Sequence, residues 1–264
     1  MRLILHADDF GASQDIYTAT VDCFDKGVLT SASLMPLMPY SHEAIGYAKS
    51  HPEFSFGAHL TFARVTVERP VSDPGMIPHL VNEDGDFMNS DQIRTKAFLH
   101  KIPIGEIERE IEAQLGYFRD HGLNLSHIDS HCHIHKLGHF PEALARVLPR
   151  FSINRVRTVQ NIYVCKPLRS PTYWLGDYWA WRIRKRFITT DHFFMPRETE
   201  GYEWARDYSW LNKVIASCHG KTIEMGFHPG FLGWNDQERR ALLCLADFAR
   251  EKAMALTNWQ EIAP

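Results

Sequence analysis

Four histidines and one aspartate alternate with other residues in His127-Ile128-Asp129-Ser130-His131-Cys132-His133-Ile134-His135. Side chains two residues apart lie on the same face of an extended strand. The pattern therefore predicts that all five polar side chains point the same way. If buried, such a face needs partners, and a divalent metal ion suits it because imidazole nitrogen and carboxylate oxygen are common ligands. The alternative is a surface histidine cluster or a set of hydrogen-bonded loop residues.

Polar residues follow other apolar runs of strand length in the same way. Residues 2–7 run into Asp8-Asp9-Phe10-Gly11, residues 54–61 carry His59 near their end, and residues 222–227 run into His228-Pro229-Gly230. Glu224 would share the face of His228. Open parallel sheets and barrels keep their chemistry at the carboxyl ends of their strands. We therefore expect these polar residues to meet at one end of a parallel sheet.

The intervening segments predict the rest of an α/β architecture. Apolar residues recur with helical spacing in several of them, and short apolar runs predict the remaining strands. The expected helices cover 14–26, 42–50, 104–118, 140–148, 204–217 and 236–252, and further strands cover 30–35, 125–131, 155–159, 188–194 and 255–258. This alternation predicts a distorted or incomplete parallel (β/α) barrel, TIM-like, with about seven strands.

Three of the polar residues have simpler explanations. Asp and Gly are favoured in turns and helix caps, so Asp8 and Asp9 could serve there. Ser13, however, is placed to cap the helix that follows, which leaves the two acids less well explained by capping. A lone histidine such as His59 is often a hydrogen-bonded core residue rather than a ligand.

Composition limits the class of protein. The chain has 264 residues, 44% of them hydrophobic and 23% charged, which predicts one globular domain over 1–264 with loop excursions near 63–101 and 160–200. The net charge of -3 argues against nucleic-acid binding. Five scattered cysteines without a CxxC pair indicate free thiols. With no secretory signal or membrane span in the sequence, we expect a cytoplasmic protein.

The segment 173–187 mixes aromatic and basic side chains, with Trp174, Trp179 and Trp181 close to Arg182 and Arg184. Such a mixture can stack on sugars, bind an anionic head group or lie at a membrane surface. It is also compatible with an ordinary amphipathic helix whose aromatic residues pack on the core. A peripheral membrane contact through 173–187 is therefore a hypothesis, and the surplus of aromatic residues in the chain would suit a homodimer interface.

Four motifs in order along the chain resemble those of the YdjC-like (ChbG-type) carbohydrate deacetylases, a family that includes hopanoid-biosynthesis-associated deacetylases. The motifs are Ala7-Asp8-Asp9-Phe10-Gly11, Gly57-Ala58-His59-Leu60-Thr61, the 127–135 stretch, and Glu224-Met225-Gly226-Phe227-His228-Pro229-Gly230. The resemblance implies a distorted barrel that removes the acetyl group from an N-acetylated sugar, such as N-acetylglucosamine, with one divalent metal ion. Cys132 stands where many relatives have a polar residue or a histidine, and none of the four motifs lies in the 160–200 region.

The resemblance also implies roles for single residues. Asp9, His59 and His131 would bind the metal, which is Mg²⁺ or Zn²⁺ by ligand type, with Mn²⁺ or Co²⁺ also compatible. Asp8 would be the general base. Open positions on such an ion would lower the pKa of water and polarise the acetyl carbonyl.

The remaining candidate residues rest on position alone. His228 is our candidate acid for the departing amine, with Arg157 or Glu224 orienting Asp8 or His228. The rest of the 127–135 face would fix ligand tautomers or touch the sugar: His127, Asp129, His133 and His135. The substrate would be an oligosaccharide, a glycan or a glycolipid, and the 173–187 segment favours a lipid-linked or long glycan.

Two other classes of function remain open at this point. A different metal hydrolase, such as a phosphoesterase, would use similar residues but commonly with two metal ions about 4 Å apart. A non-catalytic sugar-binding protein could retain the same scaffold. The presence of both Asp8 and Asp9 argues against the second class, because binding alone does not require the additional acid.

Overall fold

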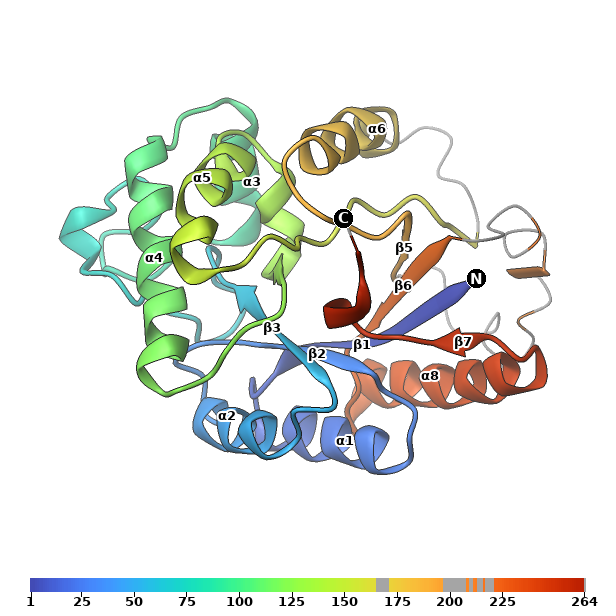
Figure 1. Ribbon diagram of the computed structural model, residues 1–264. Coiled ribbons are helices and arrows are strands. Elements are labelled where there is room, and N and C mark those ends of the chain that lie inside the picture. The colour runs from blue at the N-terminus through green and yellow to red at the C-terminus, as the bar shows by residue number, and fades with distance from the viewer. Residues whose placement is uncertain (165–170, 197–207, 209–210, 213–215, 217–220, 264) are drawn as a thin grey trace.

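The computed structural model describes residues 1–164, 171–196, 208, 211–212, 216 and 221–263. Strands and helices alternate through most of this part of the chain (Figure 1). The strands are β1 Arg2–Phe10, β2 Ser31–Leu34, β3 Ser55–Leu60, β4 Ile128–Ser130, β5 His192–Phe194, β6 Thr222–Phe227 and β7 Ala255–Leu256. The α-helices are α1 Gln14–Asp25, α2 Ser41–Ser50, α3 Ser90–Phe98, α4 Ile104–Asp120, α5 Phe140–Val147, α6 Pro171–Arg184 and α8 Gly233–Glu251.

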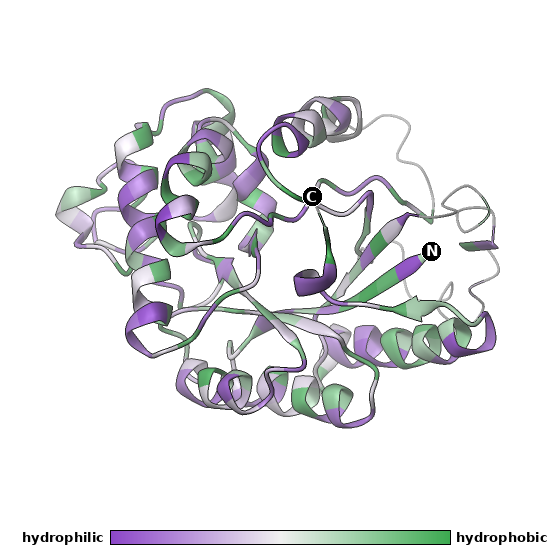
Figure 2. Cartoon of the chain, viewed as in Figure 1, coloured by the Kyte–Doolittle hydropathy of each residue, from purple (hydrophilic) through white to green (hydrophobic). Residues whose placement is uncertain are grey.

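The seven strands form one parallel sheet, in the order β4-β3-β2-β1-β6-β5, with β7 pairing to the start of β1. The helices α1, α2 and α8 lie together on one side of it, and α3, α4 and α5 gather at another (Figure 1). In Figure 2 these outer helices carry both hydrophobic and hydrophilic residues, as helices with one covered face do. The predicted incomplete parallel barrel is confirmed.

Alternate residues of the strands separate the apolar core from a polar interior. In β1, Leu3, Leu5 and Ala7 belong to the main hydrophobic core with the outer helices, whereas Ile4 packs with Trp259 and Ile262. His6 and Asp8 follow Ile4 on the interior face, and both are almost completely buried. The barrel interior is therefore apolar at the amino ends of the strands and polar above that layer.

The 155–159 segment does not form the regular strand that was predicted. It makes only isolated bridges, Val156 to Ile128 and Arg155 to Ile188. Farther along, the amides of Asn161 and Ile162 donate to the carbonyl of Phe193. The segment lies between β4 and the 188–194 region, but it pairs with each neighbour through too few consecutive residues to build a ladder. This irregular closure is what makes the barrel distorted.

The two predicted loop excursions contain short helices. The first includes a 3₁₀ turn at Pro74–Met76 and then α3, and the second contains α6 and β5. The helix predicted over 204–217 lies almost entirely outside the described residues. Within the part of the chain that the structure describes, no helix combines the length and the apolar character needed to cross a membrane.

Candidate metal and catalytic site

Asp9, His59 and His131, here called the Asp-His-His cluster, meet at the carboxyl ends of their strands. Asp9 Oδ1 lies 3.1 Å from His59 Nε2 and 3.1 Å from His131 Nδ1. One potential ligand atom from each residue lies within 4.8 Å of those of the other two. The structure thus brings together the three residues for which metal binding was predicted, from segments 50 and more residues apart in sequence.

A local irregularity of β1 allows two adjacent acids to serve one site. Strand alternation alone would send Asp8 and Asp9 to opposite faces. Asp9, however, has a φ of 59°, and the pairing of β1 with β2 shifts register between Ala7 and Phe10. A bulge of this kind redirects a side chain, and left-handed non-glycine residues tend to occur at functional sites. The carboxylate of Asp9 consequently faces the two histidines.

Asp129 fixes the orientation of His59. Its Oδ1 lies 2.9 Å from His59 Nδ1, and Ser33 donates a hydrogen bond of 2.9 Å to its Oδ2. A histidine that donates its Nδ1–H to a carboxylate presents the lone pair of Nε2 to a metal ion. This is the tautomer that the Asp-His-His cluster requires from His59.

The charges of the cluster favour a cation. Burial alone would lower the pKa of His59, but Asp129 and Asp9 raise it to about 10. Burial opposes the charged form of His131 as well, and Asp9 nevertheless raises its pKa well above the usual value. The surrounding carboxylates therefore stabilise positive charge at this position, as a site for a divalent metal ion must.

Asp8 lies beneath this cluster in an ion pair with Arg157. The Nη1 and Nη2 atoms of Arg157 donate to the two oxygens of Asp8 at 2.7 and 2.8 Å, and Arg157 also contacts Asp129 and Glu224. Burial raises the pKa of Asp8, but Arg157 more than compensates and holds it below the usual value. Asp8 is therefore an ionised carboxylate whose orientation Arg157 fixes, and Glu224 fixes Arg157 in turn.

His228 follows β6 and pairs with a residue that the sequence did not single out. Glu238 of α8 accepts from the backbone N–H of His228 at 2.6 Å, and its Oε2 lies 3.1 Å from His228 Nδ1. Burial would lower the pKa of His228, but Glu238, with Asp9 and Asp8, raises it to about 9. His228 can thus hold a proton at neutral pH, with Glu238 rather than Arg157 or Glu224 as its partner.

Comparison of the sequence with known proteins assigns the chain to a family. A family model described as YdjC-like protein matches residues 2–258. The chain belongs to the YdjC-like family. Among its relatives, a carbohydrate deacetylase of Brevibacillus brevis is 37% identical over 97% of this chain and 90% of its own. A carbohydrate deacetylase of Geobacillus stearothermophilus is 31% identical over 87% of this chain and 79% of its own.

A solved structure supports the fold of this YdjC-like protein. It is a putative cellobiose-phosphate cleavage protein of Enterococcus faecalis V583, which superposes with a TM-score of 0.77. The two proteins are 23% identical, and the match covers 100% of this chain and 99% of the other.

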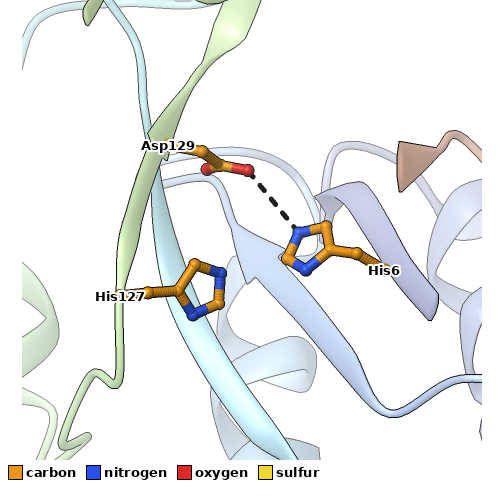
Figure 3. A group of neighbouring side chains, drawn as sticks. All are labelled: His6, His127 and Asp129. Carbon is orange, nitrogen blue, oxygen red and sulfur yellow. Dashed lines mark ion pairs between the residues drawn. The ribbon is translucent and has the colours of Figure 1, made fainter. Parts of the chain in front are cut away.

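Below the Asp-His-His cluster, the YdjC-like chain carries an inner polar group, His6, His127 and Asp129 (Figure 3). His6 Nε2 lies 3.5 Å from Asp129 Oδ2 and 3.4 Å from Asp8 Oδ1, so His6 joins the network although the sequence reasoning missed it. Its position two residues before Asp8 on the same strand face was the available signal. Its ring nitrogens also contact Ser31 and Ser33.

His127 is completely buried, and its ring stacks on Trp259 with centroids 4.8 Å apart. Burial lowers the pKa of His127 well below the usual value. A neutral, enclosed imidazole at this depth supports the packing of the interior.

The prediction that the 127–135 stretch has one continuous polar face is wrong beyond Ser130. β4 ends there, and His131–Lys136 forms a 3₁₀ turn in which Cys132 and His133 have φ values of 57° and 53°. Left-handed residues turn the chain and cancel the two-residue period. His135 is buried, with Nδ1 2.8 Å from Ser130 Oγ and Nε2 3.2 Å from the carbonyl of Arg157.

His133 instead lines a cavity of about 390 Å³ beside the turn. Arg94 and Lys136 contribute positive charge to its wall. Aromatic rings add flat surface: Phe98 of α3, Trp179 of α6 and Tyr163. Burial, with Lys136, lowers the pKa of His133 well below the usual value, so its ring is neutral. The cavity is two residues from His131 along the chain and combines polar with aromatic groups.

Proposed function

We propose that the protein is a metal-dependent hydrolase that removes the acetyl group from an N-acetylated sugar. The observation that carries the proposal is the meeting of Asp9, His59 and His131 with two further groups of complementary charge, Asp8 and His228. The names of the relatives support the reaction, since carbohydrate deacetylases match most of this chain.

The donor set fits one divalent metal ion. One carboxylate oxygen and two imidazole nitrogens leave coordination positions open, which is typical of catalytic rather than structural sites. The orientation of His59 by Asp129 supports the assignment, because metal-binding histidines commonly donate their other N–H to a carboxylate. When bound, such an ion lowers the pKa of water and polarises a carbonyl oxygen. The ligand types suit Zn²⁺ and are compatible with Mg²⁺.

Two side chains around the site would each carry out one proton transfer. Asp8 would accept the proton of the attacking water, since each oxygen keeps a second lone pair beside its bond to Arg157. His228, protonated at neutral pH, would donate a proton to the departing amine. Arg157 holds Asp8 in one orientation, and Glu238 does the same for His228.

The cavity next to His133 would hold the part of the substrate that flanks the acetylated sugar. Its aromatic walls can stack on sugar faces, and its polar groups can bind hydroxyls. N-acetylglucosamine in an oligosaccharide, a glycan or a glycolipid is the proposed substrate class.

Acetate release tests the reaction. Metal-loaded wild type should release acetate from at least one of free N-acetylglucosamine, its disaccharide, longer oligomers or a glycolipid extract. His131→Ala, which keeps Asp9 and His59, should bind the metal much more weakly and lose activity. Asp8→Asn should keep its metal content and lose about 10²–10⁴-fold in kcat, the usual contribution of a general base.

The outcomes separate the alternatives. Two metal ions per chain together with phosphate-ester hydrolysis would favour a phosphoesterase. Binding of N-acetylated sugars without acetate release from any of them would favour a sugar-binding protein. Loss of metal in Asp8→Asn would reverse the roles assigned to Asp8 and Asp9.

The outer face of α6 bears on whether the substrate is lipid-linked. Trp179 faces inward and is 6% exposed, whereas Trp174 and Trp181 are 71% and 56% exposed. Tyr178 shares their face at helical spacing, and Lys185 lies over the Trp181 ring. Exposed aromatic and basic residues together favour a membrane interface. We propose that this face contacts the surface that carries a lipid-linked glycan.

Liposome co-sedimentation tests this contact. Wild type should bind vesicles that contain anionic lipid, and Trp174→Ala/Trp181→Ala should bind them at least several-fold less. Leu256→Ala, which removes an exposed apolar residue on β7, should bind like wild type. No binding by wild type would remove the proposal. A dimer in light scattering that the double variant dissociates would reassign the face to contact between subunits.

A further inference from the structure

One of the two ring nitrogens of His131 has no hydrogen-bond partner among the residues described above. Its Nδ1 faces Asp9, at 3.1 Å from Oδ1. Its Nε2 is buried and has no hydrogen-bond partner among the described residues. If Nδ1 presents its lone pair to a metal ion, Nε2 must carry the proton. A buried N–H requires an acceptor, because leaving it unpaired is destabilising.

Glu68 is the candidate for that acceptor. Among the described residues, its carboxylate is the one that forms an ion pair with Nε2 of His131. Glu68 belongs to the excursion that follows β3 and is 4% exposed. Its Oε1 lies 3.9 Å from His131 Nε2, beyond hydrogen-bond range by less than 1 Å. Local sequence pattern could not select Glu68, because it lies in a segment without sustained periodicity.

The excursion itself holds Glu68 in place. Its Oε2 accepts from the backbone N–H groups of Val65 and Thr66 at 2.9 and 2.6 Å, and its Oε1 accepts from Thr66 Oγ1 at 3.1 Å. Farther along, Glu110 of α4 accepts from the backbone N–H groups of Val71 and Ser72. The Glu68 carboxylate is therefore fixed beside His131. Among the described residues, His131 is the one cationic group that forms an ion pair with Glu68.

We infer that Glu68 is a positioning residue for His131, as Asp129 is for His59. The two carboxylates would act on the two histidine ligands from opposite directions, one from β4 and one from the excursion. Accepting the Nε2–H bond would fix the His131 tautomer and raise the basicity of Nδ1. The excursion would thereby contribute to metal affinity without supplying a ligand.

Metal affinity of the purified full-length protein tests the inference, which rests on the proposed metal site. Zn²⁺ binding would be measured in competition with a chromophoric chelator for wild type, Glu68→Gln, His131→Ala and the double variant. Glu68→Gln should weaken binding about 10–100-fold, the usual effect of losing such a partner. In the His131→Ala background, Glu68→Gln should cause no further loss, because the group that it orients is gone.

Controls separate this role from loop stability. Asp73→Asn alters an exposed carboxylate of the same excursion that accepts from the Gly75 N–H, and should bind Zn²⁺ like wild type. Melting temperatures of the metal-free variants report folding. Should Glu68→Gln fail to fold, Glu68→Asp, which keeps the charge but shortens its reach, should weaken Zn²⁺ binding in the same coupled manner.

The two proposals fail in different ways. Equal Zn²⁺ affinity in wild type and His131→Ala would overturn the proposed metal site itself. Loss of Zn²⁺ in His131→Ala with unchanged affinity in Glu68→Gln would overturn only the role of Glu68, leaving it a stabiliser of its own loop. If Glu68→Gln weakens Zn²⁺ binding by the same factor in wild type and in His131→Ala, the role of Glu68 toward His131 is likewise overturned.

Discussion

At the scale of single residues, two histidines of the candidate site are oriented by a carboxylate from another element. Asp129 orients His59 across neighbouring strands, and Glu238 of α8 orients His228. Buried charges are tolerated when they are paired and hydrogen-bonded. Each carboxylate offsets the cost of burying its histidine. It also sets the tautomer and the pKa of that histidine, so the same pair serves both stability and the proposed chemistry.

The pH dependence of the reaction should report the His228–Glu238 pair. In the proposed reaction His228 acts in its protonated form, so kcat should fall as pH rises through its pKa of about 9. Glu238→Gln removes the main group that raises this pKa and leaves burial, which lowers it. The alkaline limb of the kcat profile should therefore move to lower pH, with activity lost at pH 8 but partly regained near pH 6. Profiles with saturating substrate and metal would measure the shift.

Glu142→Gln is the matched control for that measurement. Glu142 is paired with Arg182 and Arg186, outside the catalytic network, so its removal should leave the alkaline limb in place. An unchanged limb in Glu238→Gln would show that His228 is not the titrating acid.

The sequence indicated which residues meet in the candidate site better than it indicated their partners. Asp8, Asp9 and His59 could be selected because polar side chains at strand ends are recognisable from local pattern. Glu238 could not, because it reaches His228 from a helix whose docking no local period encodes. The bulge at Asp9 was equally invisible, since a left-handed aspartate depends on its contacts rather than on its neighbours in sequence.

At the scale of elements, β3 shows why a glycine is required inside a polar barrel. The His127 ring and carbonyl lie against Gly57, and a Cβ added there would be 2.5 Å from Nε2 and 2.7 Å from the backbone oxygen. The ring is held in place by Trp259, on which it stacks with centroids 4.8 Å apart, and by the edge-on ring of His6 at 5.1 Å. The absent side chain of Gly57 is what lets β3 and β4 pair beside a buried imidazole.

Gly57→Ala should therefore destabilise the protein by about 1–3 kcal/mol, the usual effect of overpacking. Gly46→Ala in the exposed middle of α2 should instead be neutral or stabilise by roughly 0.5–1 kcal/mol, because nothing lies within 4 Å of its added Cβ. Urea denaturation of both variants would compare them. A Gly57→Ala protein as stable as wild type would mean that β3 and β4 can separate without loss.

Strand ends were also where sequence patterns failed. Two-residue alternation continued through His135 in the sequence, but the chain left β4 after Ser130. The 155–159 segment had strand-like residues, yet it meets its neighbours only through isolated bridges. Periodicity reports which side chains are apolar, whereas a strand also needs consecutive pairing partners, and these are decided by the closure of the barrel.

At the scale of the whole molecule, the interior concentrates negative charge. Asp8, Asp9, Asp129 and Glu224 converge there, and Arg157 is the guanidinium that joins three of them. These groups come from the first strand, from segments near the middle of the chain and from β6. A divalent ion in the Asp-His-His cluster would link β1, β3 and the turn after β4, and would offset charges contributed by most of the barrel.

Metal loading should consequently stabilise the entire fold and not only the site. At a free Zn²⁺ concentration about 100 times the dissociation constant, linkage contributes about 2.7 kcal/mol. For a chain of this size that corresponds to a melting temperature roughly 5–10 °C above that of the chelator-treated protein. Differential scanning calorimetry with excess Zn²⁺ and with chelator would measure it, and Mg²⁺ tested in the same way would rank the two candidate ions.

Asp9→Asn decides where the stabilising ion binds. This variant keeps the size of the side chain and both histidines but removes the charge that lies 3.1 Å from each. It should lose most of the Zn²⁺-dependent increase in melting temperature, whereas Glu142→Gln should retain all of it. A full increase in Asp9→Asn would place the stabilising ion elsewhere in the protein, because an ion held by two histidines alone would bind too weakly to give the same shift.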